Sequence, residues 1–126
     1  MSKDYLLVVD DHFGVRRLLY EFLSQEGFCV KEAPDGETAL QIVKKVKPRL
    51  VFLDLWMYGL SGIETLIKLN QLSPHTLVIV MTASTQDKAI MAAVQNHVNS
   101  FVYKPFDLEQ LRHILYTLLS RPREAS

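Results

Sequence analysis

The feature that most constrains the fold is a repeated alternation of short apolar runs with segments of helical spacing. The runs are mostly continuous in hydrophobicity, which is typical of strands buried on both faces of a sheet. They cover residues 5–9, 28–30, 50–53, 77–81 and 101–103. Between them, apolar residues recur every three or four positions, which indicates amphipathic helices. The first such set is Val15, Leu18, Leu19, Phe22 and Leu23.

A strand followed by a helix, five times over, predicts an α/β fold. Parallel strands need long crossover connections, and the helices supply them. We therefore expect an open five-stranded parallel sheet with helices on both faces, and we assign it the order 2-1-3-4-5, which is common among such sheets. Turn residues such as Asp35-Gly36 and Ser73-Pro74 stand where the two patterns meet. The last helix is predicted over about residues 108–119.

The 126 residues suit one domain, predicted over 1–120, with 121–126 as a frayed tail or the start of a linker. The charges of fourteen basic and fourteen acidic residues cancel, which argues against direct binding to nucleic acid or an anionic membrane.

The single Cys29 lies in an apolar segment and is predicted to be a buried thiol in a reducing cytoplasm. No signal peptide or membrane-spanning run is visible, so a cytoplasmic location is expected.

Polar groups stand where four of the five predicted strands end. Asp10 and Asp11 follow the first strand, Asp54 the third, Thr82 the fourth and Lys104 the fifth. The carboxyl ends of parallel strands share one edge of a sheet, and ligands bind there at the point where the strand order reverses. In the expected order this point lies between the first and third strands. Asp10, Asp11 and Asp54 should therefore converge on one small pocket.

Three converging carboxylates repel one another unless a cation compensates them. Oxygen ligands without paired His or Cys favour a hard divalent ion such as Mg²⁺, with Mn²⁺ as a substitute. A carboxylate in such a site can attack phosphorus, while the ion, Lys104 and the Thr82 hydroxyl stabilise charge on the phosphoryl oxygens. Singly, each of these residues also fits a cap, turn or loop. Their combination at successive strand ends predicts a pocket suited to an acyl phosphate.

Four segments carry a resemblance to a known family: Val8-Val9-Asp10-Asp11, Leu53-Asp54, Met81-Thr82-Ala83 and Lys104-Pro105-Phe106-Asp107. Over nearly its whole length, the chain resembles the receiver domains of response regulators in two-component signalling. The resemblance implies a flavodoxin-like fold. It also implies a protein that catalyses its own Mg²⁺-dependent phosphorylation from a phosphohistidine donor and slow autodephosphorylation, rather than a conventional turnover enzyme.

The resemblance assigns a role to each matching residue. It makes Asp54 the phosphoacceptor. The metal ligands would be Asp11, Asp54 and the backbone carbonyl of Trp56, with Asp10 a ligand through water.

Thr82 and Lys104 become the pair that senses the phosphoryl group. Phe101 falls at an aromatic switch position three residues before the lysine, without the hydroxyl of a tyrosine.

A closer resemblance rests on Asp10-Asp11-His12-Phe13-Gly14-Val15-Arg16 and Lys104-Pro105-Phe106-Asp107-Leu108. These segments resemble the single-domain intermediate of the sporulation phosphorelay of Gram-positive spore formers. The resemblance implies a sensor histidine kinase as donor, a four-helix-bundle histidine phosphotransferase as acceptor, and a monomer. Candidates for the docking surface are Gly14, Val15, Leu18, Pro105 and Phe106, although Leu18 and Phe106 also suit an ordinary core.

The sequence departs from the family pattern at three places. Tyr58 stands where a proline is usual. His97-Val98 replaces a common Gly-Ala, which leaves the end of the fourth helix open because histidine adopts positive φ less readily than glycine. Trp56 and Ser84 flank the expected pocket, and a bulky indole there predicts slow autodephosphorylation.

Other functions remain open from the residues alone. The chain could be the N-terminal receiver of a larger regulator with a DNA-binding output domain, or a nonphosphorylatable protein-binding receiver. A flavodoxin-type cofactor binder would need a phosphate-cradling loop in place of Asp10-Asp11. An aspartyl phosphatase would carry its paired acids two residues apart on the first strand. A transition-metal site at His12 would need histidine partners that the spacing does not offer.

Overall fold

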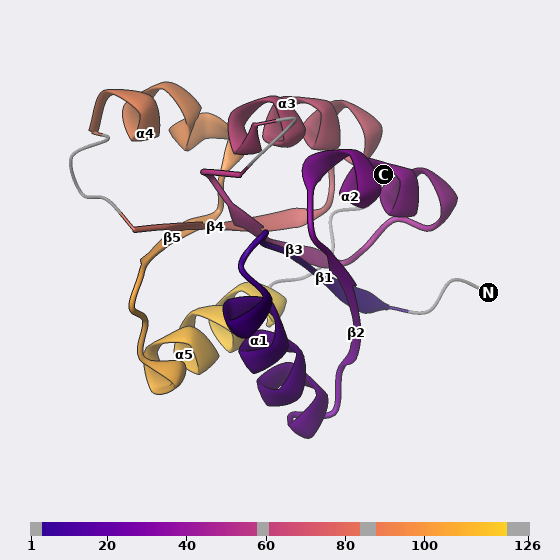
Figure 1. Cartoon of the computed structure of the whole chain (residues 1–126), viewed down its shortest axis with the longest axis vertical. Coiled ribbons are helices and arrows are strands. Elements are labelled where there is room, and N and C mark those ends of the chain that lie inside the picture. The colour runs from indigo at the N-terminus through magenta and orange to yellow at the C-terminus, as the bar shows by residue number, and fades with distance from the viewer. Residues whose placement is uncertain (1–3, 58–60, 84–87, 121–126) are drawn as a thin grey trace.

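The computed structural model describes residues 4–57, 61–83 and 88–120, in which strands and helices alternate (Figure 1). The strands are β1 (Tyr5–Val9), β2 (Cys29–Ala33), β3 (Leu50–Asp54), β4 (Leu77–Thr82) and β5 (Ser100–Tyr103). The helices are α1 (Phe13–Gln25), α2 (Gly36–Lys45), α3 (Gly62–Leu72), α4 (Lys88–Val94) and α5 (Leu108–Leu119), with a 3-10 turn η1 (Gln95–His97) after α4. The expected alternation is confirmed.

The strands form one parallel sheet in the order β2-β1-β3-β4-β5, as predicted. Helices α1 and α5 cover one face, and α2, α3 and α4 cover the other (Figure 1). Val9 is in register with Ala33 on one side and with Leu53 on the other. The carboxyl ends of β1 and β3 are therefore level at the point where the strand order reverses.

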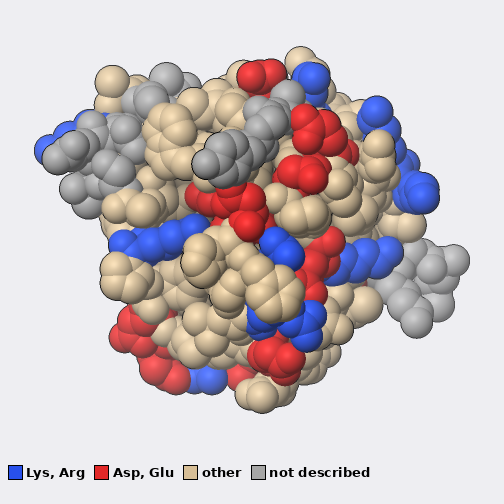
Figure 2. All heavy atoms as spheres, viewed as in Figure 1, with Lys and Arg blue, Asp and Glu red and all other residues tan. Residues whose placement is uncertain are grey.

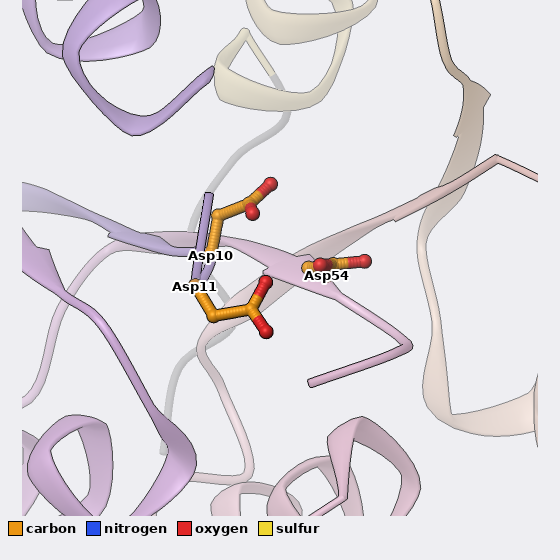
Figure 3. A group of neighbouring side chains, drawn as sticks. All are labelled: Asp10, Asp11 and Asp54. Atoms are coloured by element: carbon orange, nitrogen blue, oxygen red, sulfur yellow. The ribbon is translucent and has the colours of Figure 1, made fainter. Parts of the chain in front are cut away.

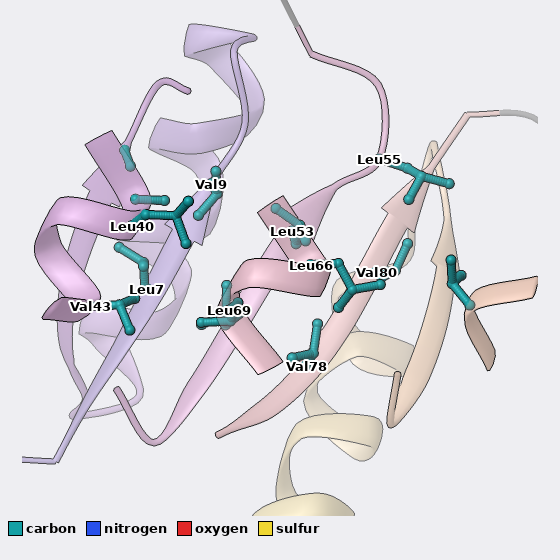
Figure 4. Packing of buried hydrophobic residues seen from close by; sticks show 14 of the residues in the cluster. Leu7, Val9, Leu40, Val43, Leu53, Leu55, Leu66, Leu69, Val78 and Val80 are labelled. Carbon is teal, nitrogen blue, oxygen red and sulfur yellow. The ribbon is translucent and has the colours of Figure 1, made fainter. Parts of the chain in front are cut away.

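Successive residues of the central strands enter two apolar clusters on opposite faces of the sheet. The cluster between the sheet and helices α2 and α3 includes Leu7, Val9, Leu40, Val43, Leu53, Leu66, Leu69, Val78 and Val80 (Figure 4). The cluster between the sheet and helices α1 and α5 includes Leu6, Val8, Leu19, Leu23, Phe52, Ile79, Met81, Leu111 and Leu115. Burial on both faces explains why the central strands read as continuous apolar runs.

Strand β2 differs from the prediction. It begins one residue later and ends three residues later than the apolar run 28–30, and side chains along it alternate between exposed and partly buried. Cys29 is exposed, so the prediction that its thiol is buried is wrong. The physical reason is that β2 lies at the edge of the sheet and pairs with β1 alone.

Side-chain caps set where several helices begin. Asp35 accepts a hydrogen bond from the Thr38 amide at the start of α2. Asp107 caps α5, and its carboxylate accepts a hydrogen bond from the Glu109 amide at 2.9 Å. The predicted bounds of α5 match the structure. Tyr58, Ser84 and the predicted tail 121–126 lie outside the described residues.

The end of the fourth helix shows how the chain accommodates His97-Val98. Helix α4 tightens into η1, and Val98 is extended with a φ of −126°. Within the described residues, positive φ occurs only at glycine. The chain therefore leaves this helix without the left-handed residue that a glycine would supply. No helix in the described part of the chain has the length and apolar character that crossing a membrane requires.

Candidate functional site: an acidic cluster at the carboxyl edge of the sheet

Three carboxylates meet where the strand order reverses (Figure 3). Asp10 and Asp11 directly follow β1, and Asp54 is the last residue of β3. One oxygen from each carboxylate lies within 4.8 Å of the others. The side chains of Asp10 and Asp54 are buried, whereas Asp11 is exposed. The structure thus brings together the three acids that the sequence placed at strand ends.

Lys104 brings a positive charge to two of these acids. Its Nζ lies 2.7 Å from Asp10 Oδ2 and 3.6 Å from Asp54 Oδ2. Its amide donates to the Thr82 carbonyl at 2.8 Å, which extends the pairing of β4 and β5 beyond the strand ends. On the same view as Figure 1, acidic side chains gather near the middle of the face, with basic side chains on both sides (Figure 2).

Burial raises the pKa of Asp54 to about 6, and the charge of Asp10 acts in the same direction. Lys104 opposes this rise, as does the Trp56 amide, which donates to Asp54 Oδ1 at 3.2 Å. The acids together therefore carry more negative charge than one lysine compensates. A bound cation would favour the ionised form of Asp54.

His12 supports the acids through its backbone while its ring caps a helix. The His12 amide donates to Asp10 Oδ1 at 2.8 Å. Its Nδ1 accepts from the Val15 amide at 3.2 Å, which makes His12 the N-cap of α1. Within the described residues, the group of three or more side chains close enough to share a metal ion consists of aspartates alone. This arrangement gives no support to a transition-metal site at His12.

Two residues near the cluster had no role in the sequence predictions. A Cβ on Gly62 would collide with the backbone carbonyl oxygens of Asp54 and Leu55, so the start of α3 can approach the end of β3 only because residue 62 is glycine. Arg16 donates from Nη1 to the Asp10 backbone carbonyl at 2.7 Å. Arg16 was missed because an arginine on an amphipathic helix gives no local signal of a partner on a strand.

The remaining predicted site residues surround the acids. Thr82 is buried at the end of β4. Phe101 on β5 is partly buried and packs against the cluster between the sheet and helices α2 and α3. The Trp56 side chain is 47% exposed.

The five docking candidates divide by exposure. Gly14, Leu18 and Pro105 are exposed, and the 47% exposure of Leu18 excludes it from the core. Val15 and Phe106 are partly buried and pack against the cluster between the sheet and helices α1 and α5.

A family model described as the response regulator receiver domain matches residues 6–116. The chain belongs to this family. The receiver domain of NtrX from Brucella abortus has a similar structure, with a TM-score of 0.85 and 30% sequence identity over 93% of this chain and 99% of that one. The response regulator protein TrrA from Thermotoga maritima, in complex with Mg²⁺ and BeF, has a TM-score of 0.82 and 29% identity over 92% of this receiver and 99% of that chain.

Curated relatives of this receiver domain differ in length. It is 36% identical over 112 residues to the sporulation initiation phosphotransferase F of Bacillus subtilis, covering 89% of this chain and 90% of that protein. It is 33% identical over 114 residues to the regulatory protein AtoC of Escherichia coli, covering 90% of this chain but only 25% of AtoC. Single receivers and the receiver portions of longer regulators are thus both among its relatives.

Proposed function

We propose that this receiver domain is a phosphorelay intermediate, which takes a phosphoryl group from a histidine kinase onto Asp54 and passes it to a histidine phosphotransferase. The observation that carries the proposal is the cluster of Asp10, Asp11 and Asp54, with the Lys104 ammonium beside Asp10 and Asp54. The match to the sporulation initiation phosphotransferase F covers 90% of that protein, which favours a relay in sporulation. Such a protein works in the cytoplasm, without direct contact with nucleic acid or membrane.

The donor set suits a hard divalent cation. Three carboxylates offer only oxygen ligands, and the Trp56 carbonyl is proposed as a fourth. The likeness to TrrA, whose structure is a complex with Mg²⁺ and BeF, supports Mg²⁺ in this receiver. Mn²⁺ should substitute, because it accepts the same ligands. When bound, the cation supplies positive charge that offsets the acids and the phosphoryl oxygens.

The transfer itself uses residues already at the carboxyl edge of the sheet. A carboxylate oxygen of Asp54 forms a bond to phosphorus while the phosphorus–nitrogen bond of the donor phosphohistidine breaks. The electron pair stays on the imidazole nitrogen, which takes up a proton. The Lys104 ammonium and the Thr82 hydroxyl stabilise charge on the phosphoryl oxygens. Onward transfer to the acceptor histidine is the same exchange in reverse.

Two further roles complete the proposal. Phe101 acts as a switch residue whose packing changes when Thr82 turns toward the phosphoryl group. Both partners dock on a surface formed by Gly14, Val15, Leu18, Pro105 and Phe106, and the receiver works as a monomer. The exposure of Gly14, Leu18 and Pro105 favours this surface.

A second candidate function is that of an N-terminal receiver controlling an output domain. The observation that favours it is the set of longer relatives, of which the chain spans 25% for AtoC and 28% for the transcriptional regulatory protein GlrR of Escherichia coli. A relay receiver transfers its label to a phosphotransferase histidine. A receiver of a transcription factor instead dimerises or activates its output domain when labelled.

The test is the intact mass of the protein after incubation with acetyl phosphate and Mg²⁺. The wild type should gain one phosphoryl group, and neither the Asp54→Asn variant nor a metal-free sample should gain it. An adduct on Asp54→Asn would overturn the assignment of Asp54. No adduct under any condition would favour a nonphosphorylatable, protein-binding receiver.

A further inference from the structure

Arg16 on α1 reaches back to the end of β1 and is held there by three partners. Its Nη1 donates to the Asp10 carbonyl at 2.7 Å, and its Nε lies 3.3 Å from Glu32 Oε1 on β2. Its guanidinium carbon lies 5.5 Å from the centre of the Phe13 ring. The side chains of Arg16 and Glu32 are only 14% and 20% exposed. A guanidinium so enclosed makes a stronger, better oriented hydrogen bond than a freely solvated one.

The bonded carbonyl belongs to the peptide group that joins Asp10 to Asp11. The other peptide group of Asp10 is also anchored, because its amide donates to the Ala33 carbonyl of β2 at 3.2 Å. Together these bonds tie both peptide groups of Asp10 to groups supported by β2. The direction in which Asp11 leaves the strand therefore depends on the hydrogen bond from Arg16.

Arg17 offers a natural comparison. Its Nη1 lies 2.6 Å from Glu32 Oε2, so both arginines share one carboxylate. Its other partners are Glu21, at 3.2 Å, and the Tyr20 ring. Both of these lie along α1 rather than at the acidic cluster.

We propose that Arg16, oriented by Glu32, is a positioning residue that fixes the Asp10–Asp11 peptide plane so that both carboxylates face the cation site. This inference rests on the proposed function. It is needed because adjacent carboxylates repel one another and would otherwise turn apart. Partners that orient metal ligands from outside the coordination shell commonly change metal affinity by about 10- to 100-fold.

The first measurement is a Mg²⁺ titration of tryptophan fluorescence. Trp56 is the single tryptophan of the chain and is two residues from Asp54, so it reports directly on the site. Arg16→Met should weaken Mg²⁺ binding about tenfold, whereas Arg17→Met should change it by less than about twofold. Arg16→Lys, which keeps a cationic donor, should recover part of the loss.

A second measurement examines the metal-free protein. The backbone amide resonances of Asp11 and His12 should shift in Arg16→Met and stay in place in Arg17→Met. Phosphorylation should be followed with acetyl phosphate, because this small donor needs no docking surface on α1. Its rate at saturating Mg²⁺ should approach that of the wild type, since the defect lies in forming the cation site.

Glu32→Gln is the milder second variant, because it keeps Arg16 and the shape of the side chain while removing the ion pair. It should weaken Mg²⁺ binding about threefold, by loosening Arg16. The comparison with Arg17→Met therefore stands even where Arg16→Met fails to fold.

Equal Mg²⁺ affinity and equal amide shifts in the Arg16, Glu32 and Arg17 variants would overturn the inference. The proposed function would survive this result if the wild type still forms its Asp54 adduct. A wild type with neither Mg²⁺ binding nor an adduct would overturn both.

Discussion

The Lys104 ammonium lies 2.7 Å from a carboxylate oxygen of Asp10, although the two residues are 94 positions apart in the chain. The Asp10 carboxylate is fully buried, and a buried charge is costly unless it is paired and hydrogen-bonded. This contact links the first strand to the loop after the last, across the edge that holds the acidic cluster. It therefore stabilises the acidic cluster in the metal-free protein as well as placing the lysine charge beside Asp54.

Removing the lysine charge should destabilise the metal-free protein. Lys104→Met leaves Asp10 and Asp54 without their cation, and we expect a loss of roughly 3 kcal/mol in the free energy of unfolding at neutral pH. The check is urea denaturation of Lys104→Met, Asp10→Asn and the double variant. The double variant should lose less than the sum of the single losses, because the two groups interact directly. Additive losses would argue against this ion pair.

Asp54 should make the metal-free protein less stable as pH rises. Its pKa is about 6 in the folded protein against an ordinary 3.8, so the folded state binds more protons between these values. The free energy of unfolding therefore falls as pH rises through that window. Asp54→Asn, which cannot ionise, should be more stable than the wild type by about 3 kcal/mol at neutral pH and by little below the ordinary pKa of aspartate.

Thermal unfolding of both proteins across this pH range measures the difference. Saturating Mg²⁺ should reduce it, because the ion stabilises the ionised wild-type cluster more than the variant. A constant difference at every pH would show that ionisation of Asp54 is not its cause.

Gly62 should tolerate no side chain. In Gly62→Ala the new methyl group would meet the carbonyl oxygens of Asp54 and Leu55, and backbone atoms cannot move aside as a flexible side chain can. We expect a loss of about 2 kcal/mol or more and weaker Mg²⁺ binding, since the end of β3 must shift. Gly14→Ala is the matched control, because its new Cβ would meet only the His12 ring, at 3.1 Å. Chemical denaturation of the two variants should separate them clearly.

Tyr5 should ionise at a higher pH in the folded protein than in the unfolded chain. Burial raises its pKa from 10.0 to about 12, and its hydroxyl donates to the Val46 carbonyl. The folded state keeps this proton longer than the unfolded state, so the stability that it contributes is present below pH 10.0 and lost as pH approaches 12. An ultraviolet titration of phenolate should show a late transition near pH 12 that disappears in Tyr5→Phe. Its persistence in that variant would assign it to another tyrosine.

Trp56 should prolong the lifetime of the phosphorylated protein. Its side chain is half-exposed and belongs to the residue two positions after Asp54, so we expect the indole to restrict the approach of water to an acyl phosphate. Trp56→Ala should lose its label several-fold faster, a change on the order of 1 kcal/mol in the barrier to hydrolysis. Loss of the phosphoryl mass with time after removal of the donor measures this rate. Equal lifetimes would show that the indole does not shield the site.

Local sequence was sufficient for the element types and, once a common strand order was assumed, for the meeting of the three acids. Burial on both faces makes the central strands continuously apolar, and helical spacing marks the crossovers between them. Once the sheet is parallel, Asp10 and Asp54 must share an edge, because both stand at carboxyl ends of neighbouring strands. The prediction failed at Cys29, since an apolar residue on an edge strand has the same local pattern as one in the core.

The partners of the acids depended on how the elements pack in three dimensions. Lys104 reaches Asp10 because β1 and the loop after β5 meet at one edge, and Arg16 reaches the Asp10 carbonyl because Glu32 on β2 holds its guanidinium. The pKa of Asp54 likewise depends on burial by residues far away in the chain. Periodicity encodes which face of an element is apolar, but it carries no information on which polar groups from distant segments come within hydrogen-bonding distance. Those contacts follow from strand register and helix placement, which arise only when the whole chain packs.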